Sequence, residues 1–312
     1  MSNQRPILVM SNVILDDVQY PDGALHPRTL GGAAVYAAAA ASMWWGQIGI
    51  VAGVGSDFDA TAGAALAQYG IRREGLIVRD ANTIRSKLIY HADGERSETP
   101  VYGRDHFARL QLTPADIPQV LLPAAGTYIF RDIWPDFWSA FQSSRKYLGT
   151  VMWELQGDAA QAHNLSSIAS LFRQVDLFSL NIAEAHRLLD ISAPESIVTQ
   201  LIGAGAPVVV LRMGADGALV SNGREQLHVK PPPSPVVDVT GGGNAFCGGF
   251  LAGWCQRLGD LAHASRCAAA SAALTLAQHG LPSSIIRRDL LRLYDATGIS
   301  RHSLSFDRTP YL

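Results

Sequence analysis

The sequence contains few cysteines and little charge, and it has no apolar run of the roughly 18–20 residues that a membrane-spanning helix needs. Its three cysteines, Cys247, Cys255 and Cys267, lie among small residues at spacings that match no metal-binding motif. We therefore expect them to be reduced core residues of a cytoplasmic protein. Residues 2–5 are polar and lead directly into a predicted strand, so neither a signal peptide nor a membrane partner is expected.

Charge is balanced as well as sparse. The 25 basic and 27 acidic residues leave a formal net charge of −2, with no basic patch and no polyanionic tail, which argues against nucleic acid as a partner. Apolar residues make up 48% of the 312-residue chain, enough for a large buried core. This length is ordinary for one large α/β domain with an inserted segment, so we expect residues 1–312 to form a single domain.

Short apolar runs alternate with helical patterns along the chain. Several of the runs are apolar on both faces, and they predict strands at 7–15, 47–54, 126–130, 149–155, 175–180 and 207–211. Between and after them, helical patterns occur at 32–45, 61–69, 136–145, 164–172, 182–189, 194–203, 244–258 and 260–279. This alternation indicates a doubly wound α/β domain with a mainly parallel sheet flanked by helices.

The segment of residues 76–102 departs from this alternation. It contains β-rich runs at Ile77-Val78 and at residues 85–90, a turn signal at Asp93-Gly94, and no helical pattern. Within an otherwise α/β chain, such a segment predicts a small β-sheet inserted into the domain. We interpret it as a lid.

Three consecutive glycines, Gly241, Gly242 and Gly243, stand immediately before a helical pattern of small and apolar residues. Their N–H groups are not covered by side chains, and the positive end of the helix dipole lies behind them. Together these groups predict a site for an anion, most naturally a phosphate. The next residue, at the start of the helix, is Asn244 rather than a carboxylate.

This stretch resembles the C-terminal signature of the ribokinase-like (PfkB) carbohydrate and nucleoside kinases, D-T-x-G-A-G-D-x-F-x-x-G. The matching residues are Asp238, Thr240, Gly241, Gly243, Phe246 and Gly249. The departures are Val239 for Thr, Gly242 for Ala, and Asn244 for the Asp that acts as general base in the family. The resemblance implies a ribokinase-like fold, ATP and Mg²⁺ as cofactors, and an anion hole made by Gly241, Gly242 and Gly243, with Asn244 at the base position.

Two N-terminal motifs resemble the sugar-binding residues of this family. Asp16 ends the first strand pattern, where the family has an Asp that hydrogen-bonds sugar hydroxyls; a solvated loop acid is the alternative. Gly31 and Gly32 precede a helix, as in the family motif G-G-x-x-x-N, and let a ligand approach the backbone. Tyr36 replaces the Asn of that motif, either as a pocket residue with a usable hydroxyl or as a core aromatic. The resemblance implies substrate-binding roles for these four positions.

Three further motifs belong to the nucleotide side of the resemblance. Asn181 and Glu184 match N-x-x-E, which governs Mg²⁺ and phosphate in the family, largely through water; a helix cap with a first-turn acid is the alternative. Arg212 and Gly214 lie in a strand and turn that resemble the segment under the nucleotide, where Arg212 meets a phosphate or forms a surface ion pair. Thr240 completes the residues for which the resemblance implies nucleotide binding. Apolar helix faces, including residues 268–275, are expected to form the adenine pocket.

Two expectations are mainly architectural. Val51-Ala52-Gly53-Val54-Gly55-Ser56-Asp57 resembles the family segment V-G-x-V-G-x-D, a strand followed by a turn in which Asp57 is predicted to cap a helix. Lids of this family cover the sugar and often form the dimer contact, so we expect a small-molecule substrate and a homodimer through the lid. The sequence contains no G-x-x-x-x-G-K-[ST] loop, H-E-x-x-H motif or G-x-S-x-G elbow that would indicate another chemistry.

The neutral amide of Asn244 leaves three interpretations of the activity. The first is an ATP-dependent phosphotransferase acting on a hydroxyl of a sugar, nucleoside or related small polar molecule. Its base would lie elsewhere, with Asp238 and Asp16 as the available carboxylates, or its acceptor would already carry an oxygen anion. The second is a pseudokinase that binds nucleotide or sugar and serves as a regulatory or interaction protein. The third is unrelated chemistry in the same cleft.

Overall fold

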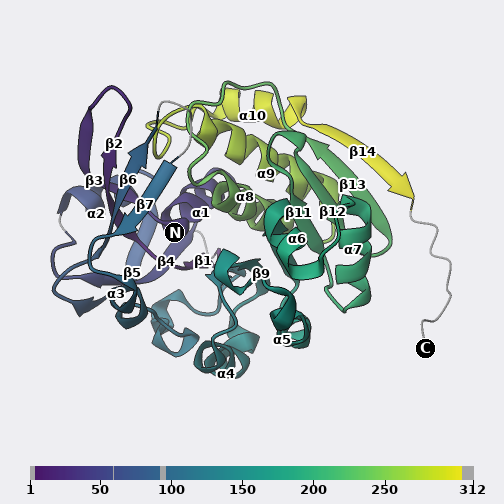
Figure 1. Cartoon of the computed structure of the whole chain (residues 1–312), viewed down its shortest axis with the longest axis horizontal. Coiled ribbons are helices and arrows are strands. Elements are labelled where there is room, and N and C mark those ends of the chain that lie inside the picture. Colours follow the sequence, from purple (N-terminus) through teal and green to yellow (C-terminus); the bar gives the residue numbers. More distant parts are fainter. Residues whose placement is uncertain (1–3, 59, 92–95, 304–312) are drawn as a thin grey trace.

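The structure is a computed structural model that describes residues 4–58, 60–91 and 96–303. A sheet of ten strands forms the body, and a separate sheet of four strands lies at one end of it (Figure 1). The strands are β1 (Ile7–Met10), β2 (Ile14–Gln19), β3 (Leu25–Gly31), β4 (Ile48–Gly55), β5 (Ile71–Asp80), β6 (Ile84–Tyr90), β7 (Arg96–Pro100), β8 (Gly126–Arg131), β9 (Thr150–Leu155), β10 (Leu177–Asn181), β11 (Val209–Arg212), β12 (Ala218–Ser221), β13 (Glu225–Lys230) and β14 (Gly298–Ser303).

Helices cover both faces of the large sheet. They are α1 (Ala33–Ser42), α2 (Ala60–Ala67), α3 (Arg104–Arg109), α4 (Pro135–Ser144), α5 (Leu165–Leu171), α6 (Ile182–Leu189), α7 (Pro194–Gly203), α8 (Gly242–Gln256), α9 (Leu261–Leu276) and α10 (Arg287–Ala296). Two apolar clusters lie between sheet and helices, one including residues of α1, α8 and α9 and the other including residues of α4, α6 and α7. Tyr128 and Ile129 of β8 face opposite clusters, as the alternation of a strand requires.

The large sheet has the order β14-β13-β12-β11-β10-β9-β8-β1-β4-β5. From β11 to β5 all neighbouring strands are parallel, whereas β12, β13 and β14 continue the sheet in antiparallel fashion. Every residue of β4 is buried, as expected for a parallel strand covered on both faces. The predicted doubly wound α/β architecture is therefore confirmed. In such sheets ligands bind beyond the carboxyl ends of the strands.

The small sheet, called the lid below, has the order β3-β2-β6-β7. Its strands come from two separate segments of the chain, one with β2 and β3 and the other with β6 and β7. The predicted strand at 7–15 therefore divides into β1 in the body and β2 in the lid. Within the predicted lid segment 76–102, β6 and β7 lie in the lid, but the first residues belong to β5 of the large sheet. The turn signal at Asp93-Gly94 lies outside the described residues.

Close helix packing sets the position of α8. A Cβ at Gly248 would overlap the backbone of Ala37 in α1, and a Cβ at Gly253 would lie only 2.9 Å from atoms of Ala264 and Cys267 in α9. Glycines at these two positions therefore let α8 approach both neighbouring helices. The N-terminal end of α8, with the triglycine turn, is held against the first turn of α1 as a result.

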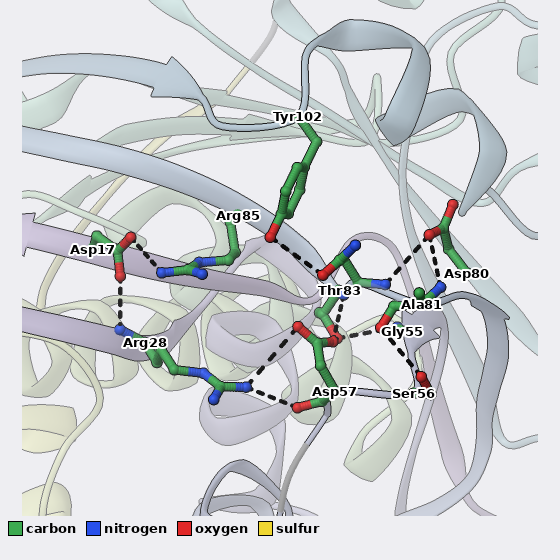
Figure 2. Close-up of polar contacts among 11 residues, drawn as sticks. Asp17, Arg28, Gly55, Ser56, Asp57, Asp80, Ala81, Thr83, Arg85 and Tyr102 are labelled. Carbon is green, nitrogen blue, oxygen red and sulfur yellow. Dashed lines mark hydrogen bonds and ion pairs between the residues drawn. The ribbon is translucent and has the colours of Figure 1, made fainter.

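Polar contacts fix the base of the lid to the body (Figure 2). Asp57 does not cap α2, which begins at Ala60; its Oδ1 accepts hydrogen bonds from the backbone N (2.6 Å) and the hydroxyl (2.7 Å) of Thr83, just before β6. Arg28 of β3 donates to the Asp57 carbonyl oxygen at 2.8 Å (Figure 2). Arg85 of β6 donates to Asp17 of β2 at 2.6 Å, which joins the two halves of the lid. Asp57, predicted to cap a helix, thus binds the residue before β6 instead.

The C-terminal part adds elements that no sequence pattern predicted. Helix α10 packs against α9, and β14 pairs with β13 over residues 298–303. Cys247 and Cys267 are buried and Cys255 is half-buried, all three with free thiols. Within the described part of the chain, every helix is too short or too polar to cross a membrane.

Candidate active site

The triglycine turn begins α8, and its shape requires glycine. Gly241 is the N-cap residue with φ of 73°, a left-handed conformation that glycine adopts without strain. A Cβ at Gly241 would overlap the ring of Tyr36, and a Cβ at Gly243 would overlap the guanidinium of Arg212. The turn is therefore bounded by Tyr36 on one side and Arg212 on the other, while Gly241 and Gly243 stay partly exposed. This is the geometry of an anion site at a helix N-terminus.

A mainly apolar cavity of about 390 Å³ opens beside this turn. Gly242 and Gly243 lie in its wall together with Arg212, Gly214 and Asn181. The remaining wall is formed by side chains of two segments, among them Pro231, Pro232, Val236, Val239, Ala269, Ala272, Ala273 and Leu276. The predicted contribution of residues 268–275 to a pocket is thus present. An apolar cavity whose wall also contains a cation and glycine backbone suits a flat, hydrophobic group attached to phosphates.

Asn244 does not stand alone at the start of α8. Its Nδ2 donates to the hydroxyl of Tyr128 at 3.1 Å and to Oε1 of Glu154 at 3.3 Å. The Tyr128 hydroxyl in turn donates to Oε2 of Glu154 at 2.7 Å. Glu154 is only 2% exposed and Tyr128 is fully buried. The position expected for the general base is therefore backed by a buried carboxylate from a neighbouring strand.

Arg212 forms an internal ion pair rather than a surface one. Its Nη2 lies 2.9 Å from Oε1 of Glu154 and 3.9 Å from Oε2 of Glu184, and its Nε donates to the hydroxyl of Ser179 at 3.1 Å. Burial alone would lower the pKa of Arg212, but the negative charge of Glu154 raises it above its usual value. The guanidinium stays charged at the end of the cavity, where it can attract a phosphate.

Asn181 and Glu184 form a reciprocal capping box at the start of α6. The Asn181 side chain accepts from the Glu184 backbone N at 2.9 Å, and Oε2 of Glu184 accepts from the Asn181 backbone N at 2.7 Å. Burial raises the pKa of Glu184, more than the nearby charge of Arg212 lowers it. The helix cap proposed as one alternative for this pair is therefore present, and the cap also places Asn181 in the cavity wall.

The donor set fits a hydrated magnesium ion better than a protein cage. Across residues 4–58, 60–91 and 96–303, no three His, Cys, Asp or Glu side chains are grouped closely enough to hold a metal. Glu184 supplies one carboxylate beside the cavity. Mg²⁺ keeps several waters and is commonly bound through one carboxylate and substrate phosphates, so a single protein carboxylate is chemically sufficient.

The residues expected to bind the acceptor meet at the first turn of α1. Asp16 is only 8% exposed, and its carboxylate lies against Gly31, where a Cβ would overlap it. Gly32 is the N-cap of α1 with φ of 93°, and a Cβ there would overlap the backbone of Asn12. Tyr36 is 6% exposed and packs on Gly241, so the structure supports the core-aromatic interpretation of this residue. Its ring joins the acceptor motif to the anion turn.

A contact that sequence reasoning missed ties the lid to the loop before α8. The Tyr90 hydroxyl, at the end of β6, lies 3.0 and 3.1 Å from the carboxylate oxygens of Asp238 and 2.6 Å from the hydroxyl of Thr240. The Thr240 backbone N also donates to Asp238, at 2.8 Å. Thr240 therefore shapes the loop and meets the lid, rather than lining the cavity.

Glu154 and Tyr128 were also missed, although Glu154 carried a signal. It is an acid within the apolar strand Thr150–Leu155, and a charge in such a run is unusual unless it is paired. Tyr128 and Tyr90 carried none, because buried tyrosines are common in strands and their partners are distant in sequence.

The profile of the pfkB family of carbohydrate kinases matches residues 26–287. The chain belongs to this family. A cytidine kinase from Thermococcus kodakarensis is 27% identical over 263 residues, which cover 81% of this chain and 92% of that protein. The range matched by the family profile contains the candidate site residues Gly31, Asn181 and Arg212 and the whole triglycine segment.

Solved structures show the same fold. Aminoimidazole riboside kinase from Salmonella enterica, determined with aminoimidazole riboside and an ATP analogue, superposes with a TM-score of 0.74 at 19% identity, covering 93% of this chain and 100% of that one. Fructokinase from Vibrio cholerae, determined with fructose, ADP and calcium, gives 0.75 at 19% identity, covering 94% and 100%. The chain therefore has the ribokinase-like α/β fold. In this protein the fold consists of a mainly parallel sheet flanked by helices and a small separate sheet.

Proposed function

We propose that this protein is an ATP-dependent phosphotransferase that acts on a hydroxyl of a sugar, nucleoside or related small polar molecule. One observation supports it most: the N-terminal glycine turn of α8 forms part of the wall of a 390 Å³ apolar cavity, with Arg212 beside it. An adenine nucleotide combines an apolar ring with terminal phosphates in this order. Membership of a family of carbohydrate kinases, and relatives named for cytidine and aminoimidazole riboside, support the substrate class.

Each candidate residue then has a physical role. Gly241, Gly242 and Gly243 offer N–H groups to the transferred phosphoryl group, and Arg212 adds positive charge. Asn181 and Gly214 line the nucleotide cavity, and Glu184 would hold Mg²⁺ through water. A bound Mg²⁺ would neutralise charge on the phosphates. On the opposite side, Asp16 accepts hydrogen bonds from acceptor hydroxyls next to the backbone of Gly31 and Gly32.

The second candidate function is a pseudokinase that binds nucleotide or sugar and regulates a partner. Asn244 favours it, because its amide cannot take a proton from an alcohol at neutral pH. A positioned general base contributes about 10²–10⁴-fold to rate, which corresponds to roughly 3–5 kcal/mol of barrier. Its loss slows transfer without removing the nucleotide site. Low turnover with intact nucleotide binding would distinguish this candidate from the first.

Calorimetry with Mg·ATP tests the shared premise of both candidates. We expect saturable binding at submillimolar to millimolar nucleotide, and weaker binding when EDTA removes the metal. Failure to bind at millimolar Mg·ATP would contradict the proposed kinase. A panel of sugars and nucleosides, followed by ADP release, then identifies the acceptor.

The lid also offers a surface for a homodimer, which we propose on the basis of exposed apolar side chains there and at its base. Leu25 of β3 is 69% exposed, and Val101, immediately after β7, is 47% exposed. Sedimentation equilibrium of the intact protein and of Leu25→Asp tests this. A dimer weakened by the substitution is expected, and a monomer at all concentrations would contradict it.

A further inference from the structure

The carboxylate of Glu154 lies at the centre of a buried cluster behind the anion turn. Oε1 is 2.9 Å from Nη2 of Arg212 and accepts from Nδ2 of Asn244 at 3.3 Å. Oε2 accepts from the Tyr128 hydroxyl at 2.7 Å. Three donors from β8, β11 and α8 therefore converge on one side chain of β9 that is 2% exposed. The carboxylate therefore serves as the shared acceptor of the cluster and as the ion-pair partner of Arg212.

These contacts also decide the orientation of the Asn244 amide. Glu154 is the ion-pair partner of Arg212, and the Tyr128 hydroxyl already donates its proton to Glu154. Both groups can therefore only accept from residue 244, which places Nδ2 toward the cluster and commits both amide hydrogens. The carbonyl oxygen Oδ1 points the opposite way. It can accept a hydrogen bond from an acceptor hydroxyl but cannot retain the proton.

A carboxylate at position 244 would meet a different environment. Its oxygen in place of Nδ2 would lie about 3.3 Å from Oε1 of Glu154, within direct range of a like charge. Arg212 and Glu184 face the cluster, and Arg187 lies near Glu184, so Arg212 is shared between two carboxylates while Glu154 has it as its ion-pair partner. Burial raises the pKa values of Tyr128 and Cys247 well above their usual values, so neither adds or removes charge near neutral pH.

We propose that Glu154 carries the negative charge of this site in place of residue 244, fixes the Asn244 amide with its oxygen toward the acceptor, and thereby excludes a carboxylate at position 244. Glu154 is a positioning residue that acts through Asn244. On this view Asn244 is matched to its neighbour, and restoring the Asp of the family signature alone harms the site. The acceptor part of the proposal rests on the proposed function, whereas the charge relation does not.

A charge-swap cycle tests the proposal without any substrate. Wild type, Glu154→Gln, Asn244→Asp and the double variant are melted at pH 7.5 in the same buffer. Each single variant should lose about 5 °C or more in Tm, because one leaves Arg212 without its nearest partner and the other adds a like charge. The double variant, with one carboxylate again, should regain at least half of the combined loss. Additive losses in the double variant would overturn the proposal.

Asn244→Ala supplies the matched control, because it removes the amide without adding charge. Its loss in Tm should be smaller than that of Asn244→Asp, although Asp is much closer to Asn in shape. Combined with Glu154→Gln, the alanine variant should show no recovery. If Asn244→Asp instead equals or exceeds wild type in Tm, Glu154 does not exclude a carboxylate, whether or not Glu154→Gln folds.

Phosphotransfer gives a second and independent measurement once an acceptor is known. Asn244→Asp alone should show no gain in kcat, while the double variant should exceed Asn244→Asp by about tenfold or more, the lower range for a positioned base. A gain in the single variant equal to that of the double variant would contradict the proposal. If no variant transfers phosphate, the proposed function fails, and the melting cycle still decides the role of Glu154.

Discussion

At the scale of single residues, Gly241 combines two constraints that no other residue type meets. Its φ of 73° costs an L-residue about 1–2 kcal/mol, and a Cβ would overlap Tyr36. We therefore expect Gly241→Ala to lower Tm and to weaken Mg·ATP binding at least tenfold, since the turn must shift. Calorimetry and thermal melting measure both effects.

Gly259→Ala is the matched control for this substitution. Gly259 has a φ of 84°, but a Cβ there would meet no atom within 4 Å, and it lies away from the cavity. It should lose a similar conformational contribution to stability and keep its nucleotide affinity. Equal loss of binding in the two variants would contradict the role given to the triglycine turn.

Glu184→Gln separates the charge of this residue from its capping role. The glutamine oxygen can still accept from the Asn181 backbone N, so α6 should remain capped. Burial raises the folded-state pKa of Glu184 above 4.5, so wild type loses stability as pH rises from 4.5 through the raised value. The variant should lack that loss and be at least as stable at pH 7, as pH-dependent melting would show.

The same variant should bind Mg·ATP no better than wild type binds ATP in EDTA, and its affinity for metal-free ATP should be unchanged. If Mg²⁺ strengthens ATP binding equally in both proteins, Glu184 does not serve the metal.

Several site residues were predictable from the sequence, and the reasons differ. The glycine turn could be found because its chemistry lies in adjacent residues. The partners of Asn244 could not, since Tyr128 and Glu154 lie 116 and 90 positions away and meet it only through the order of strands in the sheet. For Arg212, the sequence could not decide between a phosphate contact and a surface ion pair, because the spacing of residues in a sequence does not reveal whether a side chain is buried.

At the scale of elements, the lid is bonded to the loop that precedes the glycine turn. Tyr90→Phe removes the hydroxyl that meets Asp238 and Thr240, and leaves Asp238, only 6% exposed, short of one donor. Asp238 still accepts from the Thr240 backbone N, so the expected cost is that of one hydrogen bond to a charged group, about 1.5–3 kcal/mol. We expect faster hydrogen exchange in β6 and β7, with exchange in α9 unchanged.

Tyr102→Phe controls for loss of a lid hydroxyl, because its contacts, with Asn82 at 3.3 Å and with Arg85 at the start of β6, do not include the loop before α8 (Figure 2). It should leave exchange in β6 close to wild type. Equal protection of β6 in wild type and Tyr90→Phe would show that the contact does not hold the lid.

The boundaries of elements show where sequence patterns stop being informative. The apolar run at 7–15 reads as one strand, yet residues 11–13 turn the chain from β1 into β2 of another sheet. Hydrophobic periodicity cannot reveal such a turn, because β1 is fully buried and apolar residues continue into β2, half of whose residues are buried. Strand β14 was missed for a related reason: it is an edge strand whose order comes from pairing with β13.

At the scale of the whole molecule, both apolar clusters pack against the same ten-stranded sheet, so the protein should unfold as one unit. We expect a single calorimetric transition with equal calorimetric and van't Hoff enthalpies. Mg·ATP at 100 times its Kd should stabilise that transition by about 2.7 kcal/mol. A separate low-temperature transition of the lid, insensitive to Tyr90→Phe, would contradict a single domain over residues 1–312.

Strands β2 and β6 lie side by side and run in the same direction, although 70 positions separate Ile14 from its neighbour Ile84 and β4 and β5 of the body intervene (Figure 1). The chain consequently crosses between body and lid four times, before β2, after β3, before β6 and after β7. Removing the lid from such a protein would require two separate deletions, and the chain would have to be rejoined at each of them. Insertion of new loops into the lid is correspondingly easier than its deletion. Either half of the lid, β2–β3 or β6–β7, can lengthen while the other half keeps its position.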